Sequence, residues 1–190
     1  MDGIVVMPGY KSPESPYGYA KEIMKGREVP VWIYFNRKAN PYQLTHRELA
    51  KLIAIYREGI MGVKVSVTDD KYKDYDIQRL RSALALKDGF AYWLRAFLGS
   101  EEVLFDHPEL AKHGIVSSTA NTRPELMVKL DKAIREGNLD ELATYRAEIE
   151  PNHQRYASAG GSVPVIKQDL FGAGKISSPE LSERNPLYKK

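Results

Sequence analysis

Residues 59–66 read Gly59-Ile60-Met61-Gly62-Val63-Lys64-Val65-Ser66, a short apolar run with one lysine near its C-terminal end. Such a run is typical of a strand in a parallel sheet, where both faces are covered. A lysine in this setting loses hydration, which favours the neutral amine, and a neutral amine attacks carbonyls to form Schiff bases. In the alternative interpretation, the stem of Lys64 lies along apolar surface and its ammonium reaches solvent. The segment alone leaves both interpretations open.

The composition is that of an ordinary soluble globular domain. The chain has 190 residues, of which 43% are hydrophobic and 28% charged, enough for one sizeable core. Its net charge of +3 is small and of mixed sign, so we expect no nucleic-acid partner. The sequence contains no apolar run as long as a membrane span and opens with no signal-peptide pattern, so we expect no membrane attachment.

Cysteine and histidine usage narrows the chemistry. The chain has no cysteine, which excludes disulfides, thiolate metal ligands and a cysteine nucleophile, and fits a cytoplasmic protein. The histidines stand far apart, at positions 46, 107, 113 and 153, without the spacing of a metal-binding helix. No G-x-G-x-x-G or P-loop pattern follows a strand, which disfavours nucleotide binding. We therefore expect a cytoplasmic protein without a metal or a cofactor.

Five apolar runs alternate with helical patterns. The predicted strands cover residues 4–7, 29–35, 59–66, 90–94 and 115–117. This alternation predicts an α/β domain with a parallel sheet, in which right-handed crossovers bring the carboxyl ends of all strands to one side. Active sites of such folds lie on that side. The residues expected there are Tyr10, Tyr34, Lys64, Arg95 and Ser117.

Local signals mark the helices. Thr45 and Glu48 form a T-x-x-E capping box, which predicts that a helix begins there. Pro124 stands in the first turn of a later helix, where its missing N–H costs nothing. Other helical patterns are expected at about residues 17–24, around Ile77, Leu80 and Leu84, from Gly99-Ser100 onward, at 139–156 and at 163–170. The helix that Pro124 opens is expected to bury Leu126, Leu130, Ala133 and Ile134.

Five segments follow one another in a characteristic order and spacing. They are Val5-Val6-Met7-Pro8-Gly9-Tyr10, Val31-Trp32-Ile33-Tyr34-Phe35-Asn36, Gly62-Val63-Lys64, Gly114-Ile115-Val116-Ser117-Ser118-Thr119-Ala120-Asn121 and Gly161-Ser162-Val163-Pro164-Val165-Ile166-Lys167. Each is a weak motif alone, whereas the ordered set is fairly specific. From about residue 2 to residue 172, the chain therefore resembles the dihydrodipicolinate synthase / N-acetylneuraminate lyase family of Schiff-base class I aldolases.

Members of that family are TIM barrels with helices added at the C-terminus, and they are usually tetrameric. The resemblance implies that the strands here are the fourth to the eighth of such a barrel, in the C-terminal part of the family fold. We therefore expect a partial TIM (β/α)8 barrel of about five parallel strands over residues 1–137. A C-terminal helical extension over residues 138–172 and a tail over residues 173–190 are expected to follow.

The resemblance also implies roles for four residues. Lys64 takes the position of the lysine that forms a Schiff base with pyruvate or another 2-keto acid. Tyr34 matches the tyrosine that shuttles protons to and from the substrate, and Tyr10 matches a tyrosine that relays protons across subunits in synthase members. Val116 matches the eighth-strand position whose backbone lies close to the bound keto acid. These four residues are the predicted site.

Three features depart from the family pattern. The first three strands, with the Gly-Thr-Thr-Gly-Glu segment that binds the keto-acid carboxylate, have no counterpart here. The arginine that binds the second substrate in synthases falls nearest Ala39, and no acidic residue directly follows Lys64. Five strands of an eight-stranded barrel also leave open edges and an apolar face, which invite association. A fragment of a longer chain, a broken remnant, a partner that supplies the missing N-terminal half, and self-association all remain open explanations.

The sequence thus predicts a Schiff-base lyase or aldolase that cleaves or forms a C–C bond of pyruvate or another 2-keto acid. Without the carboxylate-binding segment the keto acid is poorly oriented, so inactivity of a truncated chain is one expectation. The alternative is a non-catalytic remnant or interaction subunit of the same family. A third hypothesis, a phosphate site at residues 117–119, competes with simple helix capping. The expected partners are a pyruvate-like 2-keto acid and either further copies of the chain or a missing N-terminal half.

Overall fold

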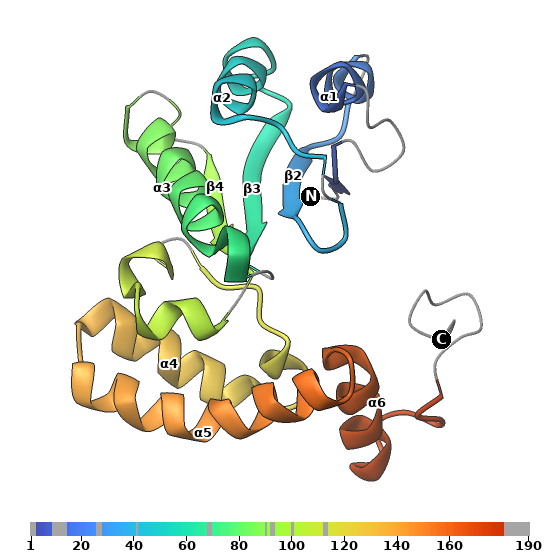
Figure 1. The fold of residues 1–190 in the computed structure, drawn as a ribbon, viewed down its shortest axis with the longest axis vertical. Coiled ribbons are helices and arrows are strands. Elements are labelled where there is room, and N and C mark those ends of the chain that lie inside the picture. The colour runs from blue at the N-terminus through green and yellow to red at the C-terminus, as the bar shows by residue number, and fades with distance from the viewer. Residues whose placement is uncertain are drawn as a thin grey trace. The chain divides into compact units, whose positions relative to one another are not determined.

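The computed structural model describes residues 3–8, 15–25, 28–40, 42–67, 70–89, 91, 94–99, 101–111 and 114–180. The chain forms two compact units, Met1–Val116 and Ser117–Lys190. The first unit holds a parallel sheet with its helices, and the second unit is helical (Figure 1).

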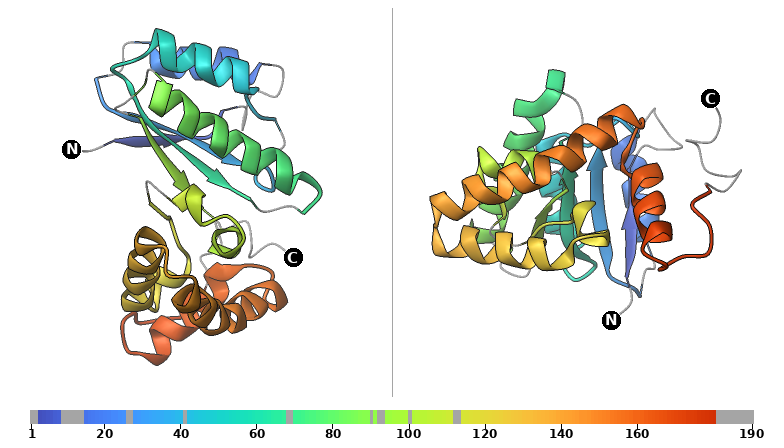
Figure 2. Two further views of the ribbon diagram at one scale, coloured as in Figure 1. Left: turned by 90° about the vertical axis from the view of Figure 1, so that its left-hand side faces the viewer. Right: turned by 90° about the horizontal axis from the view of Figure 1, so that it is seen from below.

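The sheet of the first unit contains four parallel strands in the order β1-β2-β3-β4. These are β1 (Ile4–Val6), β2 (Val31–Asn36), β3 (Ile60–Ser66) and β4 (Arg95–Leu98). The connecting helices are α1 (Pro16–Met24), α2 (His46–Ile55) and α3 (Lys73–Gly89), the last preceded by the short turn η1 (Asp70–Tyr72). All three helices lie on one face of the sheet (Figure 2). The predicted α/β class and parallel sheet are confirmed.

The helix starts follow from local hydrogen bonds. At α2, the Thr45 hydroxyl accepts from the Glu48 N–H at 3.2 Å, and the Glu48 carboxylate accepts from the Thr45 N–H at 2.8 Å. The predicted capping box is therefore confirmed. At α1, Ser15 caps the helix by accepting from the Gly18 N–H at 2.9 Å. Each of these bonds satisfies a backbone donor that the first turn of a helix leaves without a partner.

Side chains alternate between the two faces of the sheet. The helix side carries buried apolar residues, namely Val31, Ile33 and Phe35 of β2, Val63 and Val65 of β3, and Ala96 and Leu98 of β4. The opposite face, here called the far face, carries Trp32, Tyr34 and Asn36 of β2, Gly62, Lys64 and Ser66 of β3, and Phe97 of β4. Because the period of a strand is two, residues that share a face stand two apart in sequence.

One extra residue in β3 sets which side chains meet. Val31 pairs with Ile60, but Trp32 pairs with Gly62, so the register shifts by one residue at Met61. A shift of one residue turns every following side chain to the other face. It is this shift that brings Lys64 opposite Tyr34 on the far face.

The strand predicted at residues 90–94 is wrong, because β4 begins at Arg95. Ala91 donates to the Leu86 carbonyl and Leu94 donates to the Ala91 carbonyl, both at 2.8 Å, so these two buried residues close a turn after α3. The other residues of the predicted range lie outside the described ones. Aromatic residues favour strands in general, but here only the pairing with β3, which starts at Gly62 with Arg95, decides where the strand lies.

Two further expectations near the end of the first unit need correction. In the described residues, the segment 115–117 makes one parallel bridge, between Leu98 and Ile115, instead of a full strand. Gly114, with φ of +129°, turns the backbone out of extended geometry just before the bridge. The helix expected from Gly99-Ser100 is replaced by two short 3-10 turns, η2 (Glu101–Phe105) and η3 (Pro108–Ala111). Pro108 has no N–H to continue a longer helix through this segment.

The second unit contains the short turn η4 (Thr119–Asn121) and the helices α4 (Pro124–Glu136), α5 (Leu139–Ser158) and α6 (Ser162–Gly172). On α4, Leu126, Leu130 and Ala133 are buried as predicted, whereas Ile134 is half-buried. Gly137 ends α4 in the left-handed conformation, with φ of +66°. Arg123, the residue before α4, forms an ion pair with Glu148 of α5 at 2.7 Å, and Arg155 of α5 pairs with Asp169 of α6 at 2.6 Å. Along the described parts of the chain, every helix is too short or too polar to cross a membrane.

Candidate active site

Lys64 and Tyr34 are direct neighbours on the far face, paired across β3 and β2. The Lys64 Nζ lies 4.5 Å from the centroid of the Tyr34 ring. At this distance the ammonium is attracted to the face of the ring. The structure thus brings together two of the predicted site residues through the register of the sheet.

The Tyr34 hydroxyl is held by two polar side chains. Its oxygen lies 3.1 Å from the Ser66 Oγ and accepts a hydrogen bond from the Asn36 Nδ2 at 3.0 Å. The Asn36 Oδ1 in turn accepts from the Ala39 N–H at 3.1 Å. Asn36 and Ser66 are themselves paired across the two strands, and Ser66 is only 4% exposed. The polar block at the carboxyl ends of β2 and β3 therefore consists of four side chains. They are Lys64, Tyr34, Asn36 and Ser66.

Space for this block depends on Gly99, the residue after β4. A Cβ atom at this position would lie 2.3 Å from the Ser66 Oγ and 3.0 Å from the Lys64 Cε. The Gly99 N–H donates to the Val65 carbonyl at 2.7 Å, which holds its backbone against β3. A larger residue would therefore push against both polar side chains.

An aromatic layer borders the lysine on the far face. Phe97 pairs with Lys64 across β4 and β3, and Trp32 pairs with Gly62 one layer away. The two rings stack with centroids 4.9 Å apart and planes 11° from parallel. The stack crosses β3 at Gly62, where a Cβ atom would come within 2.0 Å of the Trp32 ring. The absence of a side chain at Gly62 thus allows the stacked rings of Trp32 and Phe97 to lie beside the amine of Lys64.

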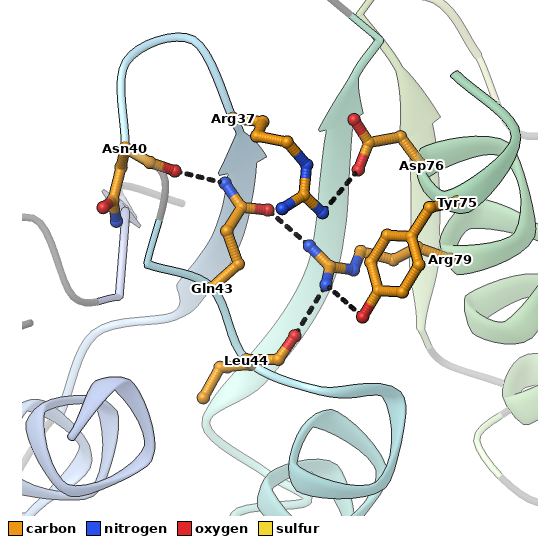
Figure 3. A network of polar contacts seen from close by, with 7 residues as sticks. All are labelled: Arg37, Asn40, Gln43, Leu44, Tyr75, Asp76 and Arg79. Carbon is orange, nitrogen blue, oxygen red and sulfur yellow. Dashed lines mark hydrogen bonds and ion pairs between the residues drawn. The ribbon is translucent and has the colours of Figure 1, made fainter. Parts of the chain in front are cut away.

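A second polar network lies on the helix side of the same strands (Figure 3). Arg79 of α3 is 1% exposed and donates to the Gln43 side chain, to the Leu44 carbonyl at 2.7 Å and to the Tyr75 hydroxyl at 3.3 Å. Its guanidinium also lies 4.2 Å from the centroid of the Phe35 ring. These contacts fasten the loop after β2 to α3.

Arg37 and Asp76 complete this helix-side network. The Arg37 guanidinium donates to the buried Asp76 carboxylate at 3.3 Å. It lies 4.4 Å from the Tyr72 ring centroid and 4.9 Å from that of Tyr75. Arg37 directly follows β2 and lies beside Asp76 in the helix-side network (Figure 3), so it does not join the block around Lys64.

The loop after β2 is also tied to the end of β1. The Gln43 side chain donates to the Asn40 carbonyl at 2.8 Å, and the Asn40 side chain donates to the Pro8 carbonyl at 2.6 Å. Asn40 is 2% exposed. A continuous set of hydrogen bonds therefore links Arg79 on α3 to the carboxyl end of β1.

Burial shapes the electrostatics of the helix side. Burial lowers the pKa of the Arg79 guanidinium, although Tyr75 and Asp76 oppose this effect. Burial also lowers the pKa of the His46 imidazole, and the nearby charge of Arg79 lowers it further. His46 stacks on Tyr75 at a centroid distance of 5.2 Å, so it belongs to the same network.

The remaining predicted residues are placed as follows. Tyr10 lies outside the described residues. Val116 is 41% exposed, and its N–H donates to the Leu98 carbonyl at 2.8 Å, beside the carboxyl end of β4. The expectation for Arg95 is wrong, because this residue begins β4 and so lies at the opposite end from the rim. The Ser117 Oγ accepts from the Ala120 N–H of the short turn η4 at 3.0 Å.

Sequence reasoning missed Asn36 and Ser66 as members of the site. The signal that could have found them is the alternation of a strand, since each stands two residues after Tyr34 or Lys64 and therefore on the same face. Within the described ranges, no three histidine, aspartate or glutamate side chains gather closely enough to hold a metal ion. The site consists of an amine, a phenol, an amide and a hydroxyl.

Two curated relatives match most of the chain at similar identity. The chain is 27% identical over 190 residues to the putative 2-dehydro-3-deoxy-D-gluconate aldolase YagE of Escherichia coli (strain K12), with 98% of this chain and 60% of that protein covered. It is 26% identical over 165 residues to the 4-hydroxy-tetrahydrodipicolinate synthase of Thiobacillus denitrificans (strain ATCC 25259 / T1), with 86% and 52% covered. The chain thus spans between 52% and 60% of the length of these curated relatives.

Solved structures share the fold. The crystal structure of YagE, a prophage protein from E. coli K12 in complex with pyruvate, matches with a TM-score of 0.76 and 26% identity over 97% of this chain and 60% of that one. The dihydrodipicolinate synthase of Bacteroides thetaiotaomicron matches with a TM-score of 0.78 over 97% of this chain and 60% of that one, and its 19% identity shows the fold alone. These neighbours are TIM barrels, so the predicted fold class, part of such a barrel, is confirmed.

The sequence match to one family extends from residue 1 to residue 189 and agrees with the shared fold. The relatives named above are a putative aldolase and a synthase. Because the match covers nearly the whole sequence, the chain belongs to the dihydrodipicolinate synthetase family.

Proposed function

We propose that this chain carries the Schiff-base site of a 2-keto-acid aldolase, with Lys64 as nucleophile and Tyr34 as proton carrier. The observation that carries the proposal is the pairing of the two residues on the far face, with the Lys64 Nζ 4.5 Å from the Tyr34 ring centroid. Among the described residues, Lys64 forms no ion pair with a carboxylate. Its nitrogen is therefore available to a carbonyl carbon.

The first step joins the amine to the substrate. The Lys64 nitrogen attacks the keto carbon, and the carbonyl oxygen becomes the hydroxyl of a carbinolamine. Tyr34 gives its proton to that hydroxyl, which leaves as water, so that a protonated imine and a phenolate remain. Positioned proton transfer of this kind contributes roughly 10²–10⁴-fold to a rate.

The second step breaks the C–C bond. The Tyr34 phenolate takes the proton of the hydroxyl on C4, the C3–C4 bond breaks, and an aldehyde leaves. The bonding electrons move toward the imine and form an enamine, which Tyr34 then protonates at C3. Water adds to the imine carbon, the keto acid is released, and both the amine and the phenol are restored. The reverse order of these steps forms the bond.

The substrate class is part of the proposal. YagE is named a putative 2-dehydro-3-deoxy-D-gluconate aldolase and was solved with pyruvate, which supports a pyruvate-like 2-keto acid as one product or substrate. Ala39 stands nearest the arginine that binds the second substrate in synthases, and its methyl group cannot hold a carboxylate. Both points favour aldol cleavage of a sugar-derived keto acid over a synthase reaction.

Further elements of the proposal concern the surroundings of the site. We place Tyr10 in a proton relay across subunits and the Val116 backbone beside the keto acid. The division into a barrel part over residues 1–137, a helical extension over 138–172 and a tail over 173–190 belongs to the same proposal, as does a cytoplasmic location. The chain spans 60% of the length of YagE, and we propose that an N-terminal half or further copies of the chain contribute to the complete site.

Borohydride trapping tests the chemistry directly. Incubation with pyruvate and borohydride should reduce the imine and leave a stable adduct on Lys64, which mass spectrometry of peptides can assign. A Lys64→Met variant should give no adduct at this peptide, and a Lys51→Met variant on the surface of α2 should react like the wild type. Absence of the adduct on Lys64, also in the presence of an N-terminal half from a relative, would overturn the aldolase and favour a non-catalytic interaction subunit.

A further inference from the structure

We propose that Asn36 and Ser66 are positioning residues that fix the direction of the Tyr34 O–H bond. This inference rests on the proposed function, because it assigns the orientation of the proton that Tyr34 is to transfer. Nothing in the sequence resemblance assigns a role to either residue.

The orientation of the Asn36 amide follows from its hydrogen bonds. The Ala39 backbone N–H can only donate, and it lies 3.1 Å from the Asn36 Oδ1. The oxygen end of the amide therefore faces the loop, and the Nδ2 end faces the Tyr34 hydroxyl at 3.0 Å. An amide nitrogen donates and does not accept. Tyr34 consequently accepts a hydrogen bond from Asn36.

This leaves one direction for the phenol proton within the block. Tyr34 has a single O–H, and the side facing Asn36 is already occupied by a donor. Among the described residues, the other polar atom within hydrogen-bond distance of the phenol oxygen is the Ser66 Oγ at 3.1 Å, which can accept that proton. In the resting site the Tyr34 O–H therefore points toward β3, the strand that carries Lys64.

Ser66 also suits the state after proton transfer. A serine hydroxyl rotates about its C–O bond and can either donate or accept. When Tyr34 has given its proton to the substrate, Ser66 can donate to the phenolate while Asn36 continues to donate from the other side. The phenolate oxygen then has two hydrogen-bond donors without any movement of the strands. Ser66 needs no change of its own protonation for this role.

The block is rigid enough to impose this orientation. Asn36 and Ser66 lie in paired positions on β2 and β3, and groups on strands are held more closely than groups on loops. Ser66 is 4% exposed, so bulk water does not compete for its hydroxyl. The close approach of Gly99, where a Cβ would lie 2.3 Å from the Ser66 Oγ, limits the space into which the hydroxyl can turn.

Two variants separate positioning from general damage. Asn36→Asp keeps the acceptor for the Ala39 N–H and the shape of the side chain, but replaces the donor facing Tyr34 by an acceptor. Ser66→Ala removes the hydroxyl and little volume. The matched control is Ser82→Ala, since the Ser82 hydroxyl donates to the Gln78 carbonyl on α3 and does not contact Tyr34.

The first measurement needs no substrate. In full-length protein with ¹³Cζ-labelled tyrosine, the Tyr34 resonance is assigned by its loss in Tyr34→Phe. Its chemical shift reports the hydrogen bonds of the phenol oxygen, so it should move in Asn36→Asp and in Ser66→Ala and stay in place in Ser82→Ala. An unmoved resonance in both test variants would overturn the proposal, whatever the outcome with pyruvate.

The second measurement follows proton transfer. Pyruvate that forms an imine on Lys64 exchanges its methyl protons with D₂O, and NMR gives the rate. We expect Asn36→Asp and Ser66→Ala each to slow this exchange by about tenfold or more, in keeping with general acid–base catalysis, while the borohydride adduct on Lys64 stays within about twofold of the wild type. Equal exchange rates with equal adducts would contradict the role of both residues. Absence of the wild-type adduct would refute the proposed function instead, and the resonance of Tyr34 would still decide the inference.

Discussion

The two faces of β2 and β3 each carry a cluster of polar side chains, and the two clusters differ in how their charged groups are paired. On the helix side, Arg79 and Arg37 are enclosed by α3, the Asp76 carboxylate and aromatic rings. On the far face, Lys64 meets the ring of Tyr34, and in the described part of the chain it has no carboxylate beside it. The first cluster uses its charges to hold the fold, whereas the second holds an amine against an aromatic ring.

The two clusters differ because the charged groups on the helix side have hydrogen-bond and ion-pair partners, whereas Lys64 lies against the ring of Tyr34. Buried charges cost free energy unless they are paired or hydrogen-bonded, and both terminal nitrogens of Arg79 donate to protein oxygens. For Lys64, the nucleophile we propose, pairing of this kind would be unfavourable, because a strong partner would compete with the substrate. Removing a residue from each face should therefore have different consequences, stability on one side and chemistry on the other.

The largest expected effect is on chemistry at the far face. Lys64→Met removes the amine and keeps an unbranched side chain of similar length, so the adduct with pyruvate and all turnover should disappear. The free energy of unfolding should change by less than about 1 kcal/mol, because volume-conserving changes are tolerated well. Mass spectrometry after borohydride treatment and urea unfolding measure the two effects. A variant that unfolds instead would show that Lys64 is structural.

On the helix side, Arg79→Met should reduce the free energy of unfolding by about 3 kcal/mol, since it leaves buried acceptors such as the Leu44 carbonyl without a donor. The control on the same helix is Arg81→Met, whose guanidinium is 46% exposed and pairs with Glu109 at 3.0 Å. An exposed ion pair contributes about 1 kcal/mol or less. Urea unfolding of the two variants checks the comparison, and equal losses would contradict it.

Gly99→Ala tests how tightly the far-face block is packed. The new Cβ would lie 2.3 Å from the Ser66 Oγ and should displace that hydroxyl from Tyr34. We expect a loss of about 1 kcal/mol in stability, in the range of overpacking, and a slower proton exchange of pyruvate. Gly89→Ala, at a position with no neighbour within 4 Å, is the control and should be neutral. Combining Gly99→Ala with Ser66→Ala should relieve the strain, and a strictly additive pair would count against the contact.

The smallest expected effect is a pH dependence on the helix side. Burial lowers the pKa of His46 in the folded protein below its unfolded value near 6.5, and the nearby charge of Arg79 lowers it further. Both residues lie against the Tyr75 ring. The unfolded chain therefore binds more protons in that range, so this contribution to stability is present above pH 6.5 and is lost as the pH falls below it. Between pH 7.5 and about pH 5, the free energy of unfolding measured in urea should fall less in His46→Gln than in the wild type. Equal losses would remove His46 as the cause.

Much of the fold was predictable because its signals are local. The capping box at Thr45 and Glu48 and the proline at 124 each involve residues within one helical turn, and both mark helices that the structure contains. The apolar run around Lys64 predicted β3 from its own composition. Such patterns depend on the chain's immediate neighbours and not on distant contacts.

Features that depend on contacts between distant parts of the chain could not be predicted from local patterns. Asp76 and Arg79 stand on a charged helix and would ordinarily be placed at the surface, yet both are 1% exposed. Their partners, Arg37, Gln43 and Leu44, lie 35 to 39 residues away in sequence. Likewise, the start of β4 at Arg95 depends on its pairing with β3.

The sequence by itself determined the strand–helix alternation, the helix starts, and the presence of one lysine in an apolar strand. Tertiary structure alone decided that Lys64 faces Tyr34, because a single extra residue at Met61 shifts the pairing of β3 with β2. It also decided that Asn36 and Ser66 meet at the Tyr34 hydroxyl. The physical reason is that strand register is a relation between segments about 30 residues apart, which no local pattern of side chains specifies.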